Sequence, residues 1–169
     1  TVTWTVEDAS GNQSTCTQDV IVVDDENPTI TTCPGNQNVS YNANCEYALL
    51  DYTGLVTAND NCDNSLTITQ SPAIGAIITG TTTVTITVKD DYNNTSICTF
   101  NVIPTDNTPP TIICPSNQSE NLEAGCNFTI PDYTGLAVTT DNCDNNLTIT
   151  QNPTIGTVIT SNTQVTLTA

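Results

Sequence analysis

The feature that most constrains this chain is an internal repeat of about 81 residues, which limits it to folds built from small, similar units. The sequences of residues 51–55 and 60–64 return unchanged at 132–136 and 141–145. The segments 2–6, 84–88 and 165–169 also correspond, so the chain begins and ends at one phase of the repeat. We expect it to be a window onto a longer array, and arrays of like modules are typical of extended structural proteins.

Period-two alternation of apolar residues and threonine marks the strands. In residues 83–88, Val84, Ile86 and Val88 alternate with Thr, which predicts one face toward a core and one toward water. Similar patterns occur at 1–6, 66–69, 98–102 and 147–150, and no segment has a helical period. The sequence therefore predicts an all-β chain with one β-sandwich in each module. Trp4 aligns with Ile86 and is expected in a core.

Module boundaries are expected where strands give way to acidic residues and proline, at 24–28 and 106–110. Proline makes such linkers short and stiff. We expect residues 1–23 to be the C-terminal strands of a preceding module, 24–105 a complete module, and 106–169 a module lacking its last strand. Residues 1–23 contain the kind of strands that 106–169 lack. One extra residue between Ile30 and Cys33, relative to the next repeat, predicts a β-bulge there.

The charge is strongly one-sided. Eighteen acidic residues face a single base, Lys89, which gives a net charge of -17. Such a chain cannot neutralise phosphates, so nucleic acid is excluded as a partner, and divalent cations are the natural counter-charge. We find no apolar run long enough to cross a bilayer, hence no transmembrane segment in these residues, and no secretion signal at residue 1.

Eight cysteines occur at four per period, with no Cys-x-x-Cys pair and no histidine. This spacing favours disulfides over a zinc site, and disulfides indicate a secreted, extracellular chain. Four cysteines in a module allow three connectivities, and spacing alone does not choose among them.

Thr and Asn supply 56 of the 169 residues, and several Asn lie in Asn-x-Ser/Thr triplets that could carry covalent glycans. The alternative is a polar, solvated strand face. The candidate glycosylation sites are Asn12, Asn38, Asn93, Asn94, Asn117, Asn127 and Asn146.

Several motifs together resemble one known family. They are Asn27-Pro28-Thr29-Ile30 before Cys33-Pro34, then Asp60-Asn61-Cys62, Gly80-Thr81-Thr82-Thr83-Val84 and Cys98-Thr99-Phe100. This combination resembles the hyalin repeat, or HYR domain, over the full period. The resemblance implies immunoglobulin-like sandwiches in tandem, as in extracellular and bacterial surface proteins associated with adhesion. The family's Asp-x-x-Gly-Asn hairpin motif is kept at residues 8–12 but has Asn93 in place of Gly at 90–94. Asn tolerates a left-handed turn, so we expect the hairpin to persist.

The resemblance also implies a disulfide pairing. It pairs Cys33 with Cys98, which leaves Cys45 with Cys62 and, one repeat on, Cys126 with Cys143. Cys16 and Cys114 remain, and we expect them to pair across the repeat junction, with residues 1–23 of one copy completing residues 106–169 of the preceding copy.

In an immunoglobulin-like sandwich the linker, the Asp-Asn-Cys loop and the last hairpin should share one end of the module. Their carboxylate and amide oxygens predict a structural Ca²⁺ site, with turn residues at solvated loop tips as the alternative. The expected ligands are Asp24, Asp25, Asn27, Asp60, Asn61 and Asp90, with Asp106, Asn107, Asp141 and Asn142 one repeat on.

The absence of histidine and arginine removes the usual activating bases and oxyanion donors, so we expect no enzyme. The leading prediction is a secreted filament or adhesin stalk, self-associating head to tail, bound to calcium and glycosylated. The alternative is an adhesion module that binds a glycan or protein through exposed loops, which two Phe, five Tyr and one Trp make less favoured.

Overall fold

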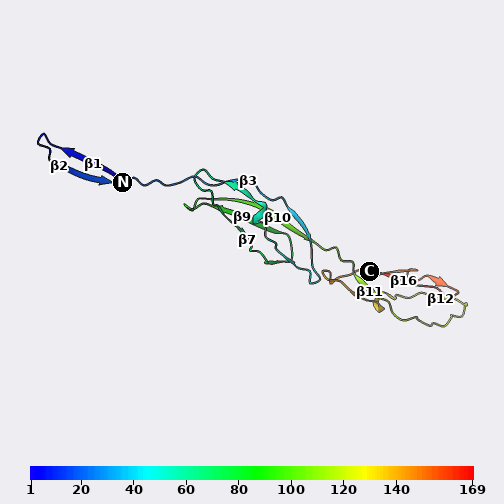
Figure 1. The fold of residues 1–169 in the computed structure, drawn as a ribbon. Helices are drawn as coiled ribbons and strands as arrows, with labels where there is room; N and C mark the ends of the chain where they lie inside the picture. The colour runs from blue at the N-terminus through cyan, green and yellow to red at the C-terminus, as the bar shows by residue number, and fades with distance from the viewer. The chain divides into compact units, whose positions relative to one another are not determined.

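The computed structural model describes all 169 residues and contains strands and two short 3₁₀ turns but no α-helix (Figure 1). The predicted all-β class is therefore confirmed. The elements are β1 (Val2–Glu7), β2 (Gln13–Gln18), β3 (Thr29–Thr32), β4 (Gln37–Ser40), β5 (Tyr47–Ala48), η1 (Thr53–Leu55), β6 (Thr57–Asn59), β7 (Thr67–Ser71), β8 (Ile77–Ile78), β9 (Thr82–Lys89), β10 (Thr95–Thr105), β11 (Thr111–Ile113), β12 (Phe128–Thr129), η2 (Thr134–Leu136), β13 (Val138–Thr140), β14 (Thr150–Asn152), β15 (Val158–Ile159) and β16 (Thr166–Thr168).

The chain packs into two compact units. The first contains residues 1–36, 50–74 and 83–101, and the second contains residues 37–49, 75–82 and 102–169. Strand β10 runs from the first unit into the second. The largest sheet has the order β4-β10-β9-β7, and the other strands form two-stranded pairs.

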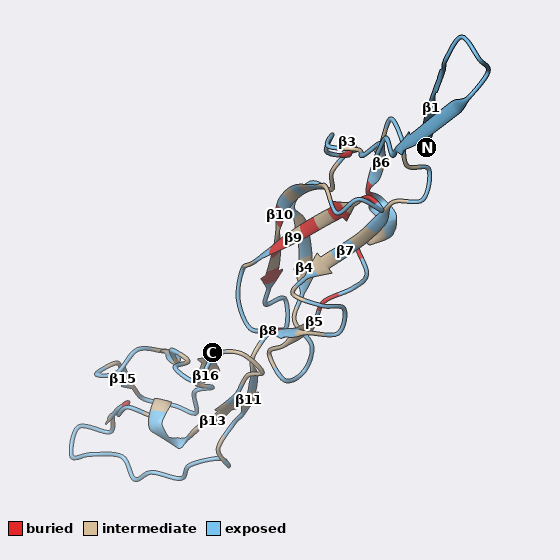
Figure 2. Ribbon diagram, turned by 90° about the vertical axis from the view of Figure 1, so that its left-hand side faces the viewer, coloured by how far each residue is buried: buried red, intermediate tan, exposed pale blue.

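The core of the first unit follows the alternation seen in the sequence. Val84, Ile86 and Val88 on β9 are fully buried, while the residues between them are not (Figure 2). Phe100 on β10 meets the ring of Tyr52 edge-on, with centroids 5.1 Å apart. Each buried aliphatic side chain stabilises the fold by about 1.5–3 kcal/mol, so β9 is the strand on which this unit most depends.

The predicted bulge is confirmed. Strand β3 pairs antiparallel with β6, and its register shifts between Ile30 and Thr32. Thr31 is the extra residue, and its hydroxyl contacts both the carbonyl and the hydroxyl of Thr57 at 3.1 and 2.8 Å. Cys33, the cysteine that follows the bulge, is bonded to Cys98 on β10.

The hairpin between β9 and β10 keeps its turn despite the loss of the family's glycine. Asn93 has φ of 74°, close to the 84° of Gly11 in the β1–β2 hairpin. Asp90 accepts the backbone N–H of Asn94 at 2.8 Å, as Asp8 accepts that of Asn12 at 2.9 Å. The prediction that Asn would hold the left-handed position is confirmed.

The expectation that Trp4 lies in a core is wrong in this structure. Trp4 is 60% exposed, whereas Ile86, at the same phase of the repeat, is 0% exposed. Every residue of β1 and β2 is exposed, because the pair forms a hairpin that no other strand covers.

In the second unit, β4 pairs in parallel with the end of β10, from Val102 opposite Gln37 to Thr105 opposite Ser40. The remaining pairs are β5–β8, β11–β13, β12–β15 and β14–β16. Only four large apolar side chains of this unit are buried, namely Leu49, Ile78, Val102 and Ile130. With so small a core, covalent links matter more to its stability.

The structure contains two disulfides. Cys33 is bonded to Cys98, the pair that the family resemblance implied, with Cα atoms 6.3 Å apart. The second bond corrects the expected pairing, because Cys45 is joined to Cys143, with Cα atoms 4.9 Å apart, and not to Cys62.

The physical reason for this correction is the meeting of two loops of the second unit. The side-chain amide of Asn142 donates to the carbonyl of Asn42 at 3.2 Å, which places the two loops against each other. Cys143 therefore bonds Cys45, and the expected Cys126–Cys143 disulfide does not form. Cys62 and Cys126 are free and exposed, as are Cys16 and Cys114, so the expected Cys16–Cys114 bond is not formed within the chain.

Candidate metal centre

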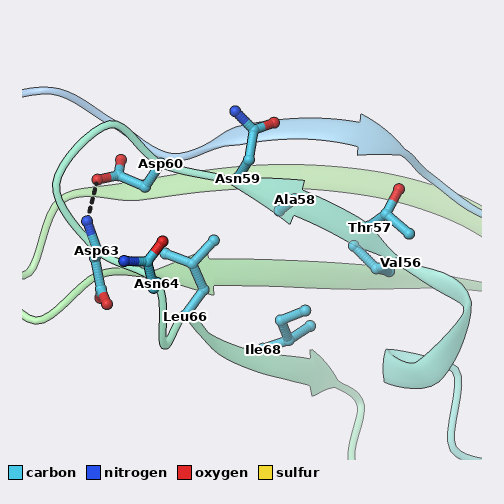
Figure 3. Close-up of a pocket in the computed structure, with 9 residues that line it drawn as sticks. All are labelled: Val56, Thr57, Ala58, Asn59, Asp60, Asp63, Asn64, Leu66 and Ile68. Atoms are coloured by element: carbon cyan, nitrogen blue, oxygen red, sulfur yellow. Dashed lines mark hydrogen bonds between the residues drawn. The ribbon is translucent and has the colours of Figure 1, made fainter.

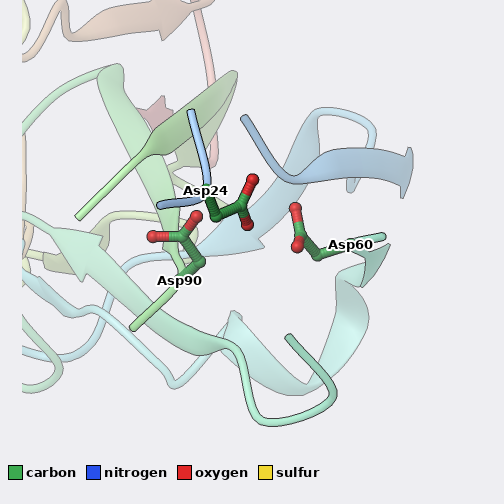
Figure 4. A group of neighbouring side chains, drawn as sticks. All are labelled: Asp24, Asp60 and Asp90. Carbon is green, nitrogen blue, oxygen red and sulfur yellow. The ribbon is translucent and has the colours of Figure 1, made fainter. Parts of the chain in front are cut away.

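Three separate stretches of chain bring three carboxylates together in the first unit. Asp24 precedes β3, Asp60 follows β6, and Asp90 follows β9. One carboxylate oxygen from each lies within 4.8 Å of the others (Figure 4). We call these three residues the carboxylate cluster. The prediction that linker, loop and hairpin meet at one end of the module holds for these side chains.

Each carboxylate is positioned by a local turn. Asp60 Oδ1 accepts the backbone N–H groups of Cys62 and Asp63, both at 3.0 Å. Asp24 Oδ1 accepts the N–H of Glu26 at 3.1 Å. These bonds use Oδ1 of Asp60 and Asp24 and leave the Oδ2 of each without a hydrogen-bond partner.

Asn94 links the other carboxylate to the linker. Its side-chain amide donates to Asp90 Oδ2 at 2.7 Å and to the carbonyl of Asp24 at 3.1 Å. Asp90 is only 2% exposed, which is unusual for a carboxylate without a basic partner. From the sequence, Asn94 is predicted only as a glycosylation candidate. Its place in the Asp-x-x-Gly-Asn motif was the signal, since Asn12 bonds Asp8 in the same way.

The cluster has the properties of a cation site. The Oδ2 atoms of Asp24 and Asp60 are buried and have no hydrogen-bond partner. The single lysine does not neutralise them, because the ammonium of Lys89 donates to Asn93. At an effective dielectric of about 20, two charges 4.8 Å apart repel by about 3 kcal/mol. A hard cation would remove this repulsion and satisfy the orphaned oxygens, and irregular oxygen ligands suit Ca²⁺.

The other expected ligands of this site are not part of the cluster. Asp25 and Asn61 are exposed. The side-chain oxygen of Asn27 accepts the N–H of Thr95 at 3.2 Å, so it is used to tie the linker to β10. Turn chemistry alone could not separate these three from the members of the carboxylate cluster, because Asp and Asn favour turns as well as cation sites.

One repeat on, the same loop forms with fewer acids. Asp141 Oδ1 accepts the N–H groups of Cys143 and Asp144 at 2.8 and 2.9 Å. These backbone bonds, with a smaller contribution from a bond with Asp106, hold the pKa of Asp141 below its usual value. Asn107 and Asn142 are engaged elsewhere, with Ser40 and Asn42 respectively. Asp106 and Asp141 therefore approach each other, but no group of three carboxylates recurs in the second unit.

Cys62 lies beside the carboxylate cluster. Partial desolvation, followed by the charges of Asp24 and Asp60, raises the pKa of its thiol. The thiol form is thus favoured at neutral pH.

A shallow polar pocket adjoins the cluster. It has a volume of about 430 Å³ and is bounded by β6 and the loop that leads to β7 (Figure 3). A second pocket of about 300 Å³, which includes Asp141 and Asp144, is built from repeat-equivalent residues in the second unit. The lining residues of the first are Val56, Thr57, Ala58, Asn59, Asp60, Asp63, Asn64, Leu66 and Ile68.

The glycosylation candidates differ in exposure. Five are exposed, namely Asn12, Asn38, Asn93, Asn117 and Asn146. Asn94 and Asn127 are half-buried, and the amide nitrogen of Asn94 already makes two hydrogen bonds at the cluster.

Residues 23–103 match the model of the HYR domain family. Residues 23–103 are an HYR domain. HYR domains are immunoglobulin-like modules of extracellular and surface proteins, so the predicted family and fold are confirmed. HYR domains are structural or adhesive modules and not enzymes, so the prediction of no enzyme is confirmed for residues 23–103.

The chain is also similar to two sea-urchin proteins named hyalin. It is 34% identical over 130 residues to hyalin of Strongylocentrotus purpuratus and 29% identical over 128 residues to that of Lytechinus variegatus. Each match covers 73% of this chain, but only 11% and 24% of the respective relative. The chain therefore corresponds to a small part of those proteins. The structure contains no helix with the length and apolar character of a membrane span.

Proposed function

We propose that this HYR chain is a segment of an extracellular array that serves a structural role in adhesion, and that Ca²⁺ at the carboxylate cluster stiffens it. The observation that carries the proposal is the pair of buried, unpartnered oxygens of Asp24 and Asp60 beside buried Asp90. Asp24 belongs to the linker, whereas Asp60 and Asp90 belong to the module. An ion bound by all three ties the linker to the module.

Calorimetric titration of the 169-residue chain with Ca²⁺ tests this proposal. We expect binding with a Kd of about 0.1–1 mM, the range of extracellular calcium modules. Asp60→Asn keeps a side-chain oxygen that can accept the hydrogen bonds of the turn but removes one of the three negative charges of the cluster. This loss of a third of the charge should weaken Ca²⁺ binding at least about tenfold.

Asp25→Asn is the matched control. It makes the same change of charge in the same linker but outside the carboxylate cluster, and it should leave the affinity within about twofold of the parent. Absence of binding heat up to 10 mM Ca²⁺, or equal losses in the two variants, would refute the site.

Within this proposal the chain associates with itself, head to tail, into a filament. The uncovered β1–β2 hairpin supports this, since its apolar residues Val2, Trp4 and Val6 are exposed. Residues 106–169 of a preceding copy are the proposed cover, with Cys16 meeting Cys114. Glycans at the five exposed sequons would face solvent. Electron microscopy of native material tests both points, and isolated modules free of sugar would contradict them.

A second candidate function is recognition of a glycan or protein ligand. The recurrence of the same polar pocket in both units favours it. A glycan array probed with the chain tests this candidate. Binding that Asn64→Ala abolishes would support it, and binding unchanged by that variant would not.

A further inference from the structure

The Cys45–Cys143 disulfide joins one repeat to the next. Cys45 lies in the repeat of residues 24–105, and Cys143 lies in the Asp-Asn-Cys loop one repeat later. Two cysteines are the exact repeat equivalents of this pair, because Cys126 is Cys45 shifted by 81 and Cys62 is Cys143 shifted back by 81. Both are free and exposed.

The free Cys126 has the same backbone conformation and turn hydrogen bond as its bonded equivalent, Cys45. Cys126 has φ of 55° and donates its N–H to the carbonyl of Glu123, while Cys45 has φ of 58° and donates to that of Asn42. Because an unbonded cysteine keeps this left-handed conformation, the turn itself, and not the disulfide, sets the backbone at this position.

The Asp-Asn-Cys loop has the same hydrogen bonds around the free Cys62 as around the bonded Cys143. Asp60 Oδ1 holds the N–H groups of Cys62 and Asp63, as Asp141 Oδ1 holds those of Cys143 and Asp144. The free Cys62 and the bonded Cys143 thus lie in the same local structure.

We propose that Cys62 and Cys126 are the open ends of a repeating covalent junction, in which the Cys126-type cysteine of each module bonds the Cys62-type cysteine of the next. Cys45–Cys143 is one closed example of it. The partner is a second HYR module, and the inference rests on the tandem array of the proposed function. It also explains why neither free cysteine bonds within its own repeat.

The bond forms by oxidation of two thiols. Cys126 and Cys62 of the next module each lose a proton and an electron, an S–S bond forms, and a small-molecule or enzyme disulfide accepts the two electrons and two protons to become a dithiol. Exchange with oxidised glutathione supplies this step in vitro.

A joined two-copy chain tests the junction at native spacing. Val2 of the second copy follows Gln164 of the first, which preserves the repeat phase because Val2 and Val165 correspond. The chain is oxidised with glutathione, free thiols are blocked with N-ethylmaleimide, and non-reduced peptides are mapped by mass spectrometry. We expect Cys126 of the first copy bonded to Cys62 of the second, with Cys45–Cys143 in both copies as internal reference.

Cys62→Ser in the second copy should leave Cys126 of the first copy blocked by N-ethylmaleimide, while the matched variant Cys16→Ser should leave the Cys126–Cys62 bond intact. A Cys45–Cys62 bond within one copy, or blocking of Cys126 of the first copy in the parent two-copy chain, would overturn the proposal. Neither result would affect Ca²⁺ binding by the single chain, so failure of the junction and failure of the calcium proposal are distinguishable.

Discussion

At the scale of single residues, two aspartates show how side chains set turns in this fold. Asp51 Oδ1 accepts the N–H and the hydroxyl of Thr53, and Asp132 does the same with Thr134. The hydroxyl bond, followed by the backbone bond, holds the pKa of each carboxyl below 3.8. A lowered folded-state pKa means that the stabilisation is present above pH 3.8 and is lost as pH falls through the folded value.

Thr53→Val should therefore raise the pKa of Asp51 toward 3.8 while leaving that of Asp132 unchanged, because only the first aspartate loses its hydroxyl donor. NMR measurement of the side-chain carboxyl carbon shifts across pH 2–6 gives the pKa values of Asp51 and Asp132 in one sample. Equal titration of Asp51 before and after the substitution would show that the hydroxyl bond does not matter.

Among the elements, the β9–β10 hairpin depends on a left-handed residue. Asn93→Val should destabilise the first unit by about 1–2 kcal/mol, since a branched side chain is strained at positive φ. Asn93→Gly restores the residue found in the first hairpin and should be neutral or stabilising. Urea unfolding measures both. If the Val and Gly variants were equally stable, the turn would not require this conformation.

A glutamine on β7 provides a second element-scale prediction. Gln70 accepts the N–H of Tyr52 at 2.8 Å and donates to the carbonyls of Leu50 and Pro72. Gln151 makes the equivalent bonds one repeat later. Gln70→Ala would leave these backbone groups unpaired and should cost about 1–3 kcal/mol in urea unfolding. Exposed Gln13 lacks such bonds to the backbone, so Gln13→Ala is the control.

The sequence predicted individual strands and turns better than it predicted which parts of the chain contact one another. Alternation identified β9, one extra residue identified the bulge at Thr31, and a motif identified the Asn93 turn, because each is a local property of the backbone. The Cys45–Cys143 bond escaped prediction because it depends on which loops of different repeats meet. The carboxylate cluster was predicted only as part of a larger set, since burial of particular oxygens has no sequence signal.

For the molecule as a whole, the charge of -17 opposes compaction, and the small apolar core offers limited compensation. Two kinds of link counter this repulsion in our account. Disulfides close loops covalently, and Ca²⁺ bound as proposed would neutralise the place where three carboxylates lie together. The folded state should therefore be stabilised by Ca²⁺ through mass action, because the unfolded chain does not assemble the site.

Scanning calorimetry of the oxidised chain at increasing free Ca²⁺ is the most direct test of that claim. With a Kd of about 0.1–1 mM, 10 mM Ca²⁺ should stabilise the chain by about 1.4–2.7 kcal/mol and raise its Tm by about 3–11 °C. Asp60→Asn should lose most of this increase. A Tm that is the same in 10 mM Ca²⁺ and in chelator would contradict the account.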